Sequence, residues 1–344
     1  MNLEISQSTP TAAAIARVVQ ANYALGEVVA GEFLRRSFNQ VYRLTLADGR
    51  HVVARLCAER PRGEPHLAFE ADVLQHLRAR GCPVATCLRT RTGEVAHRVQ
   101  LPEGERALML FEHLDGTATG DQPERIHAFG RGLAQLHAAG EGFASGASHY
   151  TLDLDYLLMR PLQHLLRAPT LTAELRAPFE AQGRRLHDRI LGLGALTRVL
   201  CHGDAHSDNN FVTVRDDGTL QAAFFDFDET GPGYLAYELA VYPWWLHPRS
   251  VDGTWSEKDL TRWGHFITAY QALRPLGEAD RAALAPFMAV RQFWLLGEYA
   301  GRVPVWGSQA IPTDYLQRQV KVLQQWETLE LPVCSPPAVR QPAS

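Results

Sequence analysis

The hydrophobic pattern of the chain changes near residue 115, and this change limits the possible folds more than any other feature. Before it, the segment FNQVYRLTLADGRHVVARLC (38–57) reads as two β-rich runs around Asp48-Gly49, a pair typical of a hairpin turn. Apolar residues at helical spacing then predict a helix over 66–81. The run ERALMLFEHLDG (105–116) predicts another buried strand. The first third of the chain is therefore expected to be a small α+β lobe.

Beyond this point helical periodicity dominates, starting with PERIHAFGRGLAQLHAAG (123–140). The chain has 344 residues, of which 46% are hydrophobic, enough to fill the core of one large domain or of two lobes. We predict an α+β fold with a small β-rich lobe over 1–113 and a larger, mainly helical lobe over 114–335. The proline-rich segment 336–344 is predicted to be a disordered tail.

Charge and composition restrict the partners and the location. The 34 basic residues nearly balance the 38 acidic ones, so neither nucleic acid nor an anionic membrane surface is an expected partner. No apolar run approaches the ~20 residues of a membrane span, and the start MNLEISQSTP lacks the features of a signal peptide. The five cysteines are scattered, as is typical of reduced thiols. We therefore expect a cytoplasmic protein.

The segment LCHGDAHSDNNFVTV (200–214) places acids, histidines and amides between two apolar runs. Asp204 and Asn209 lie in this segment, and Asp226 ends the next apolar run, AAFF. Phosphoryl transfer requires few groups: a carboxylate that orients the attacking hydroxyl, and oxygen ligands that hold Mg²⁺ against the nucleotide phosphates. Asp204 is suited to the first role, and Asn209 and Asp226 to the second. Taken alone, Asp204 and Asn209 are also typical of turns and helix caps.

The order of motifs in this segment resembles a known family. HGDAHSDNN is similar to the catalytic loop of the aminoglycoside phosphotransferase-like kinases, which include choline kinases, type II homoserine kinases and bacterial stress-response kinases. The resemblance implies a two-lobed protein-kinase-like fold, with Asp204 as catalytic base and Asn209 and Asp226 as Mg²⁺ ligands. It places His206 where protein kinases carry a lysine that contacts the transferred phosphate, and makes His202 a support of the loop. Asp226 is preferred to Asp228 because it ends the apolar run.

The resemblance extends to the first lobe, which it makes the nucleotide-binding lobe. HVVARL resembles the third strand of the family, with Arg55 as its phosphate-binding cation, and Glu70 resembles the helix acid that pairs with it. Both could instead be solvated surface charges, although Arg55 interrupts an apolar strand. The other implied nucleotide contacts are a phosphate-covering turn, which lacks the usual glycines, and a hinge whose backbone groups meet the adenine: Ser37, Phe38, Asn39, Glu112 and Leu114.

These motifs imply ATP- and Mg²⁺-dependent transfer of a phosphoryl group to a hydroxyl. A small-molecule acceptor of the amino alcohol, amino acid or sugar class is expected, and a protein Ser/Thr acceptor is the alternative. A nucleotide-binding pseudokinase is a third reading, which the retention of Asp204, Asn209 and Asp226 disfavours. The chain departs from the family at Glu238, where an Asp is usual.

Two further features of the second lobe concern the acceptor. Arg291 and Glu298 share one face of a predicted helix, where they could grip an amino acid or form part of a surface network. Trp244, Trp245 and Trp294 are expected in the core, with the lining of a pocket as the alternative.

Overall fold

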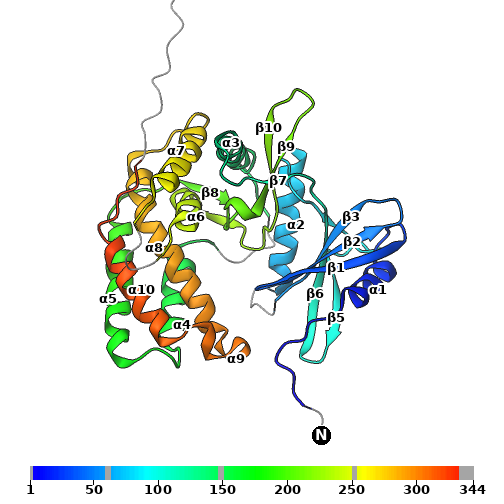
Figure 1. The fold of residues 1–344 in the computed structure, drawn as a ribbon, viewed down its shortest axis with the longest axis horizontal. Coiled ribbons are helices and arrows are strands. Elements are labelled where there is room, and N and C mark those ends of the chain that lie inside the picture. The colour runs from blue at the N-terminus through cyan, green and yellow to red at the C-terminus, as the bar shows by residue number, and fades with distance from the viewer. Residues whose placement is uncertain (1–2, 59–62, 146–150, 250–253, 333–344) are drawn as a thin grey trace, which may run out of the picture. The chain divides into compact units, whose positions relative to one another are not determined.

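A computed structural model describes residues 3–58, 63–145, 151–249 and 254–332 (Figure 1). The predicted tail, 336–344, lies outside the described residues. The chain forms two compact units, Met1–Asp115 with Gly142–His149, and Gly116–Glu141 with Tyr150–Ser344.

The first unit is built on an antiparallel sheet with strand order β1-β2-β3-β6-β4, in which β5 also pairs with β6. The predicted hairpin is formed by β2 and β3 around Asp48-Gly49, where Gly49 takes the positive φ of 86° that the turn needs. The elements are α1 (Ala12–Asn22), β1 (Val28–Arg36), β2 (Gln40–Leu46), β3 (His51–Leu56), α2 (Gly63–Ala79), β4 (Cys87–Leu88), β5 (Ala96–Leu101) and β6 (Gly104–Glu112).

Successive side chains of β3 point alternately into the core of the first unit and toward α2. Ala54 and Leu56 belong to a buried cluster that α1 covers with Ile15 and Val19. Because successive strand residues point to opposite faces, Arg55 projects away from that cluster. It meets α2 there, through Glu70.

The second unit is mainly helical, as predicted, and contains two small sheets (Figure 1). The ends of the polar segment 200–214 lie in these sheets. β9 pairs with β7 and β10, and β8 pairs with β11. The strands are β7 (Thr117–Ala118), β8 (Arg198–Cys201), β9 (Asn210–Val214), β10 (Leu220–Phe224) and β11 (Gly231–Tyr234). The helices are α3 (Pro123–Ala139), a π-helical turn (Asp155–Met159), α4 (Arg160–Leu166), α5 (Ala173–Leu191), a 3₁₀ turn (Ser207–Asn209), α6 (Leu235–Leu246), α7 (Glu257–Gln271), α8 (Glu278–Gly301), α9 (Val303–Trp306), a second 3₁₀ turn (Ser308–Ala310) and α10 (Thr313–Trp326).

Aromatic packing joins the helices that surround this segment. The Phe129 ring of α3 lies 5.3 Å from Tyr242 of α6 and 4.8 Å from Phe266 of α7, measured between ring centroids. α6 in turn packs along α8. α3 and α6 also contact β8, the strand that precedes the loop containing Asp204. Within the residues that the structure describes, no helix is long and apolar enough to cross a membrane.

Candidate active site

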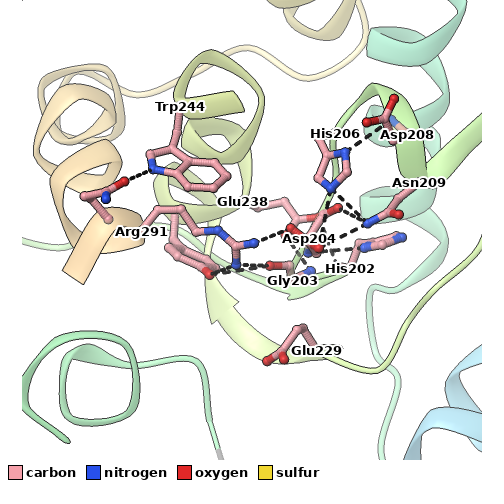
Figure 2. A network of polar contacts seen from close by, with 12 residues as sticks. His202, Gly203, Asp204, His206, Asp208, Asn209, Glu229, Glu238, Trp244 and Arg291 are labelled. Atoms are coloured by element: carbon pink, nitrogen blue, oxygen red, sulfur yellow. Dashed lines mark hydrogen bonds and ion pairs between the residues drawn. The ribbon is translucent and has the colours of Figure 1, made fainter. Parts of the chain in front are cut away.

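Asp204 lies in the loop between β8 and β9, and other residues of the second unit engage both of its carboxylate oxygens (Figure 2). Nη2 of Arg291, from α8, donates a hydrogen bond to Oδ1. Nδ2 of Asn209 donates to Oδ2 at 3.1 Å and to the Asp204 carbonyl at 3.0 Å. The Asp204 side chain is 23% exposed, so one carboxylate is both firmly held and accessible.

His206 lies near Oδ2 of Asp204, the oxygen that accepts from Asn209. Its Nδ1 accepts a hydrogen bond from the Asp208 backbone N–H at 3.2 Å, so a ring proton is carried by Nε2, which also lies 3.2 Å from Nδ2 of Asn209. That Nε2 lies 3.5 Å from Oδ2 of Asp204. The imidazole stacks nearly parallel to the half-buried Trp245 ring at 5.9 Å between centroids. Of the three tryptophans considered as pocket lining, Trp245 is therefore the one that stacks on His206.

A buried glutamate on α6 fixes the turn that precedes Asp204. Glu238 is fully buried and accepts hydrogen bonds from the backbone N–H groups of His202 and Gly203, both at 2.9 Å. Gly203 has a φ of +89°, and a Cβ added there would lie 2.2 Å from the Glu229 carbonyl oxygen. Only glycine fits this position, so the glycine of the motif is required by the turn.

His202 connects the Asp204 loop to the segment that ends in Asp226. Its Nδ1 accepts from the Asp204 backbone N–H at 3.2 Å, and its Nε2 lies 3.0 Å from the Phe225 carbonyl. Because a carbonyl only accepts, Nε2 carries the proton. Burial lowers the pKa of His202, which keeps this neutral form.

Asp226 has an unusual backbone conformation. Its φ is 68°, and Arg249 is the only other non-glycine residue with positive φ among those the structure describes. A non-glycine residue in this region costs about 1–3 kcal/mol and is held by its surroundings, commonly at functional sites. The preceding residue is fixed twice, because the Phe225 N–H donates to the Asn209 carbonyl at 3.1 Å and the Phe225 carbonyl faces His202. The two predicted metal ligands therefore belong to directly connected segments.

The charge of Asp204 depends on its neighbours. Burial alone would raise the pKa of this carboxyl group, but the Arg291 guanidinium together with His206 and His202 outweighs that effect. The pKa of Asp204 is thereby held well below its usual range. The group is an anion, and it suits a base that orients a hydroxyl and takes up its proton late in the transfer.

In the first unit, Arg55 and Glu70 form a buried ion pair. Nη1 of Arg55 donates to Oε1 of Glu70 at 2.9 Å, and Nη2 donates to Oε2 at 2.5 Å. Arg55 is 4% exposed and Glu70 is fully buried, so neither is the solvated surface charge that was the alternative reading. The guanidinium also lies 4.8 Å from the centroid of the Phe111 ring.

The remaining predicted nucleotide contacts have local partners. Ser37 N–H donates to the Asn39 carbonyl, and Asn39 Oδ1 accepts from the Ala58 N–H, both at 2.9 Å, which closes the turn between β1 and β2. Phe38, between them, is half-buried. Glu112 donates its backbone N–H to the Thr86 carbonyl at 3.0 Å, and its carboxylate pairs with Arg78. Leu114, two residues on, is half-buried. The roles of these residues stay predictions.

Of the two settings predicted for Arg291, the surface network is wrong, and a grip on an amino acid stays a prediction. Arg291 is 3% exposed, so it forms no surface network, and its carboxylate partner is Asp204, whereas Glu298 lies 3.6 Å from Arg302. Its guanidinium carbon lies 5.1 Å from the Trp244 ring centroid and 4.2 Å from that of Trp294. The signal was present in the sequence, because Arg291 interrupts the apolar run FMAVRQFWLL just as Arg55 interrupts its strand.

Comparison with known proteins agrees with this geometry. A model of the phosphotransferase enzyme family matches residues 33–276. The chain is a member of this family. An uncharacterized protein of Deinococcus radiodurans is 34% identical over 91% of this chain and 89% of its own length. A homoserine kinase of Rhodospirillum rubrum is 32% identical over 65% of each chain. The predicted family is thereby confirmed.

Solved structures show the same fold. A microcompartment-associated aminopropanol kinase covers 92% of this chain and 96% of its own, with a TM-score of 0.72 and 20% identity. The choline kinase of Cryptosporidium parvum covers 92% and 95%, with a TM-score of 0.59 and 14% identity. The predicted α+β fold, with a small β-rich part and a larger helical part, is confirmed.

Proposed function

We propose that the protein catalyses ATP- and Mg²⁺-dependent phosphorylation of a hydroxyl group on a small, amine-bearing molecule. The observation that carries the proposal is the placement of Asp204, whose carboxylate is held by Arg291 on one oxygen and by Asn209 on the other, in a member of a phosphotransferase family.

The proposed reaction needs one proton acceptor. The acceptor oxygen forms a bond to the γ-phosphorus of ATP, the bond from that phosphorus to the β,γ-bridging oxygen breaks, and ADP leaves. The hydroxyl proton passes to Oδ2 of Asp204 and then to solvent. Since the transition state is loose, the main contribution of the carboxylate is to orient the hydroxyl. His206, through Nε2–H, is placed beside this oxygen and can donate to a transferred phosphoryl group.

The residues present fit a magnesium ion bound together with nucleotide. Magnesium usually takes one or two protein carboxylates and completes its shell with phosphate and water oxygens. Nδ2 of Asn209 is directed to Asp204, which leaves the amide oxygen as the atom able to bind a cation, and Asp226 supplies a carboxylate. In the described segments no three His, Cys, Asp or Glu side chains cluster as a metal site, in keeping with so sparse a ligand set. When bound, the ion would neutralise charge that develops on the phosphates.

The nucleotide is proposed to contact the first unit through Arg55, with Glu70 fixing the guanidinium. A bidentate carboxylate partner leaves the plane of the guanidinium well defined, as recognition of phosphate oxygens requires. One protein of similar fold, an amicoumacin kinase with a TM-score of 0.70 and 16% identity, was solved in complex with AMP-PNP, which supports ATP as the donor.

The acceptor class is inferred from what related proteins are named for. Aminopropanol, choline and homoserine kinases share an acceptor that carries both a hydroxyl and an amino or ammonium nitrogen. We therefore place amino alcohols and hydroxylated amino acids before simple sugars.

The test is ADP release measured with ethanolamine, choline, 1-amino-2-propanol, homoserine, glucose and casein as acceptors, with and without Mg²⁺. The expected result is Mg²⁺-dependent ADP release that rises at least tenfold over the acceptor-free rate with one or more amine-bearing acceptors, and a phosphomonoester found by mass spectrometry. Phosphorylation of casein alone would contradict the small-molecule assignment. Absence of transfer to every acceptor would contradict the proposed function.

A further inference from the structure

Arg291 occupies an unusual position for a charged side chain. It lies in the middle of α8, is 3% exposed, and its guanidinium lies close to the Trp244 and Trp294 rings, at 5.1 and 4.2 Å from their centroids. The Trp244 ring is itself anchored, because its Nε1 donates to Oε1 of Gln292 at 2.8 Å. The two aromatic contacts hold the guanidinium in place and leave its edge for hydrogen bonds. Figure 2 shows the Trp244 ring beside it.

That edge meets the loop that carries the candidate base. Nη1 lies 3.4 Å from the Gly203 carbonyl and donates to the Tyr237 hydroxyl at 3.0 Å, while Nη2 donates to Oδ1 of Asp204. One planar group therefore binds both the backbone before the base and the base itself. A lysine ammonium, as a single point charge, does not reproduce this fork.

Stability is a poor explanation for such a pair. When two charged side chains are buried, the free-energy cost of removing them from water cancels most of their mutual attraction. An apolar pair of similar volume is often as stable. The arrangement has a clear geometric effect, however. Oδ1 is bound by a group that stays charged at every working pH and cannot exchange a proton with the carboxylate. Oδ2 accepts from the neutral amide of Asn209 and keeps a second lone pair for an acceptor hydroxyl.

We infer that Arg291 is a positioning residue for the transfer reaction: clamped by Trp244 and Trp294, it fixes the rotamer of Asp204 so that Oδ2 is presented to the acceptor. The inference rests on the proposed function. It assigns a role to α8 that the family match, which ends at residue 276, does not cover.

The test compares Arg291→Met, Arg291→Lys and Arg291→Ala with the wild type, using the best acceptor. Arg302→Met is the matched control, because Arg302 also lies over a tryptophan, 5.3 Å from the Trp306 ring, and near a carboxylate, 3.6 Å from Glu298. Since misplacement of a catalytic group by about 1 Å can cost about 10²-fold in rate, kcat should fall about 10²-fold in Arg291→Met and by less in Arg291→Lys. The Kd for Mg-ATP should stay within about twofold. The control should keep its kcat.

Chemical rescue separates positioning from folding. In Arg291→Ala, added guanidinium or methylguanidinium should restore kcat in a saturable way at concentrations that do not unfold the protein, and ammonium should not. A wild-type kcat in Arg291→Met or in Arg291→Lys would overturn the inference, as would a loss of kcat that matches the unfolded fraction seen by circular dichroism. Arg291→Lys keeps the charge and most of the length of the side chain, so it decides the question if the other two variants fail to fold. No turnover by the wild type would refute the proposed function, and this inference with it, whereas an active wild type and a fully active Arg291→Met would refute this inference alone.

Discussion

Replacement of Glu238 by alanine removes the only side chain seen to bind the backbone N–H groups of His202 and Gly203 in the part of the chain that the structure describes. Both amides would be left buried without an acceptor. An unsatisfied buried donor costs about 1–3 kcal/mol, so two such donors should lower the free energy of unfolding by about 2–6 kcal/mol. Glu238→Gln keeps one acceptor oxygen at nearly the same volume and should cost about half as much.

The assay is urea unfolding combined with native-state hydrogen exchange of the two amides. Exchange at His202 and Gly203 should accelerate by more than global destabilisation explains, because the loop loses its local anchor. Glu180→Ala is the control, since Glu180 makes an exposed pair with Arg184 at 2.8 Å and should cost less than about 1 kcal/mol. If Glu238→Ala unfolds within about 1 kcal/mol of wild type, or if both amides keep their protection, the reasoning is wrong.

Three other changes test separate parts of the account. Asp226→Asn should weaken the binding of Mg-ATP measured by calorimetry but leave metal-free ATP binding in EDTA unchanged, and equal Mg-ATP binding would move the metal ligand to Asp228. Arg55→Ala should raise KM for ATP and destabilise the fold by about 3–5 kcal/mol, because the buried Glu70 carboxylate loses the guanidinium that binds it, and Arg55→Lys should recover part of both losses. An unchanged KM in Arg55→Ala would remove Arg55 from the nucleotide site. Burial and the nearby Arg249 lower the pKa of His247 from 6.5 to about 4, and Asp259 has a smaller effect in the other direction. The unfolded chain therefore binds the proton at a higher pH than the folded protein does. The free energy of unfolding should fall as the pH drops from 7.5 to 4.5. Relative to His247→Asn, the free energy of unfolding of the wild type, measured in urea, should fall by about 2–3 kcal/mol more over this interval. Parallel pH profiles would contradict the assignment.

Local signals predicted the features that depend on neighbouring residues. The hairpin at Asp48-Gly49 follows from a turn that needs positive φ, and the strand 105–116 from a continuous apolar run; both appear, the strand as β6. Arg55 stood out because a charge inside an apolar strand must find a partner, and the structure supplies Glu70. The preference for Asp226 came from its place at the end of an apolar run, and its strained φ is a separate structural observation.

The contacts that hold Asp204 and its loop join segments that are far apart in the sequence. Asp204 and Arg291 are 87 residues apart, and Gly203 and Glu238 are 35 apart, so no periodicity or spacing connects them. Spacing along α8 suggested instead that Arg291 acts with Glu298, because helix geometry gives the shared face but not which neighbour lies against it. Glu238 carries the same signal as Arg55, a charge inside an apolar run, and its partners are backbone groups that sequence patterns do not identify.

The central claim is that Asp204 orients the acceptor hydroxyl and receives its proton, and Asp204→Asn tests it most directly. Asparagine keeps the size and one oxygen of the side chain but not its basicity. With the best acceptor, kcat measured by ADP release should fall about 10²–10⁴-fold, while the Kd for Mg-ATP measured by calorimetry stays within about twofold. A kcat for Asp204→Asn equal to that of the wild type, in a variant shown by circular dichroism to be folded, would contradict the account.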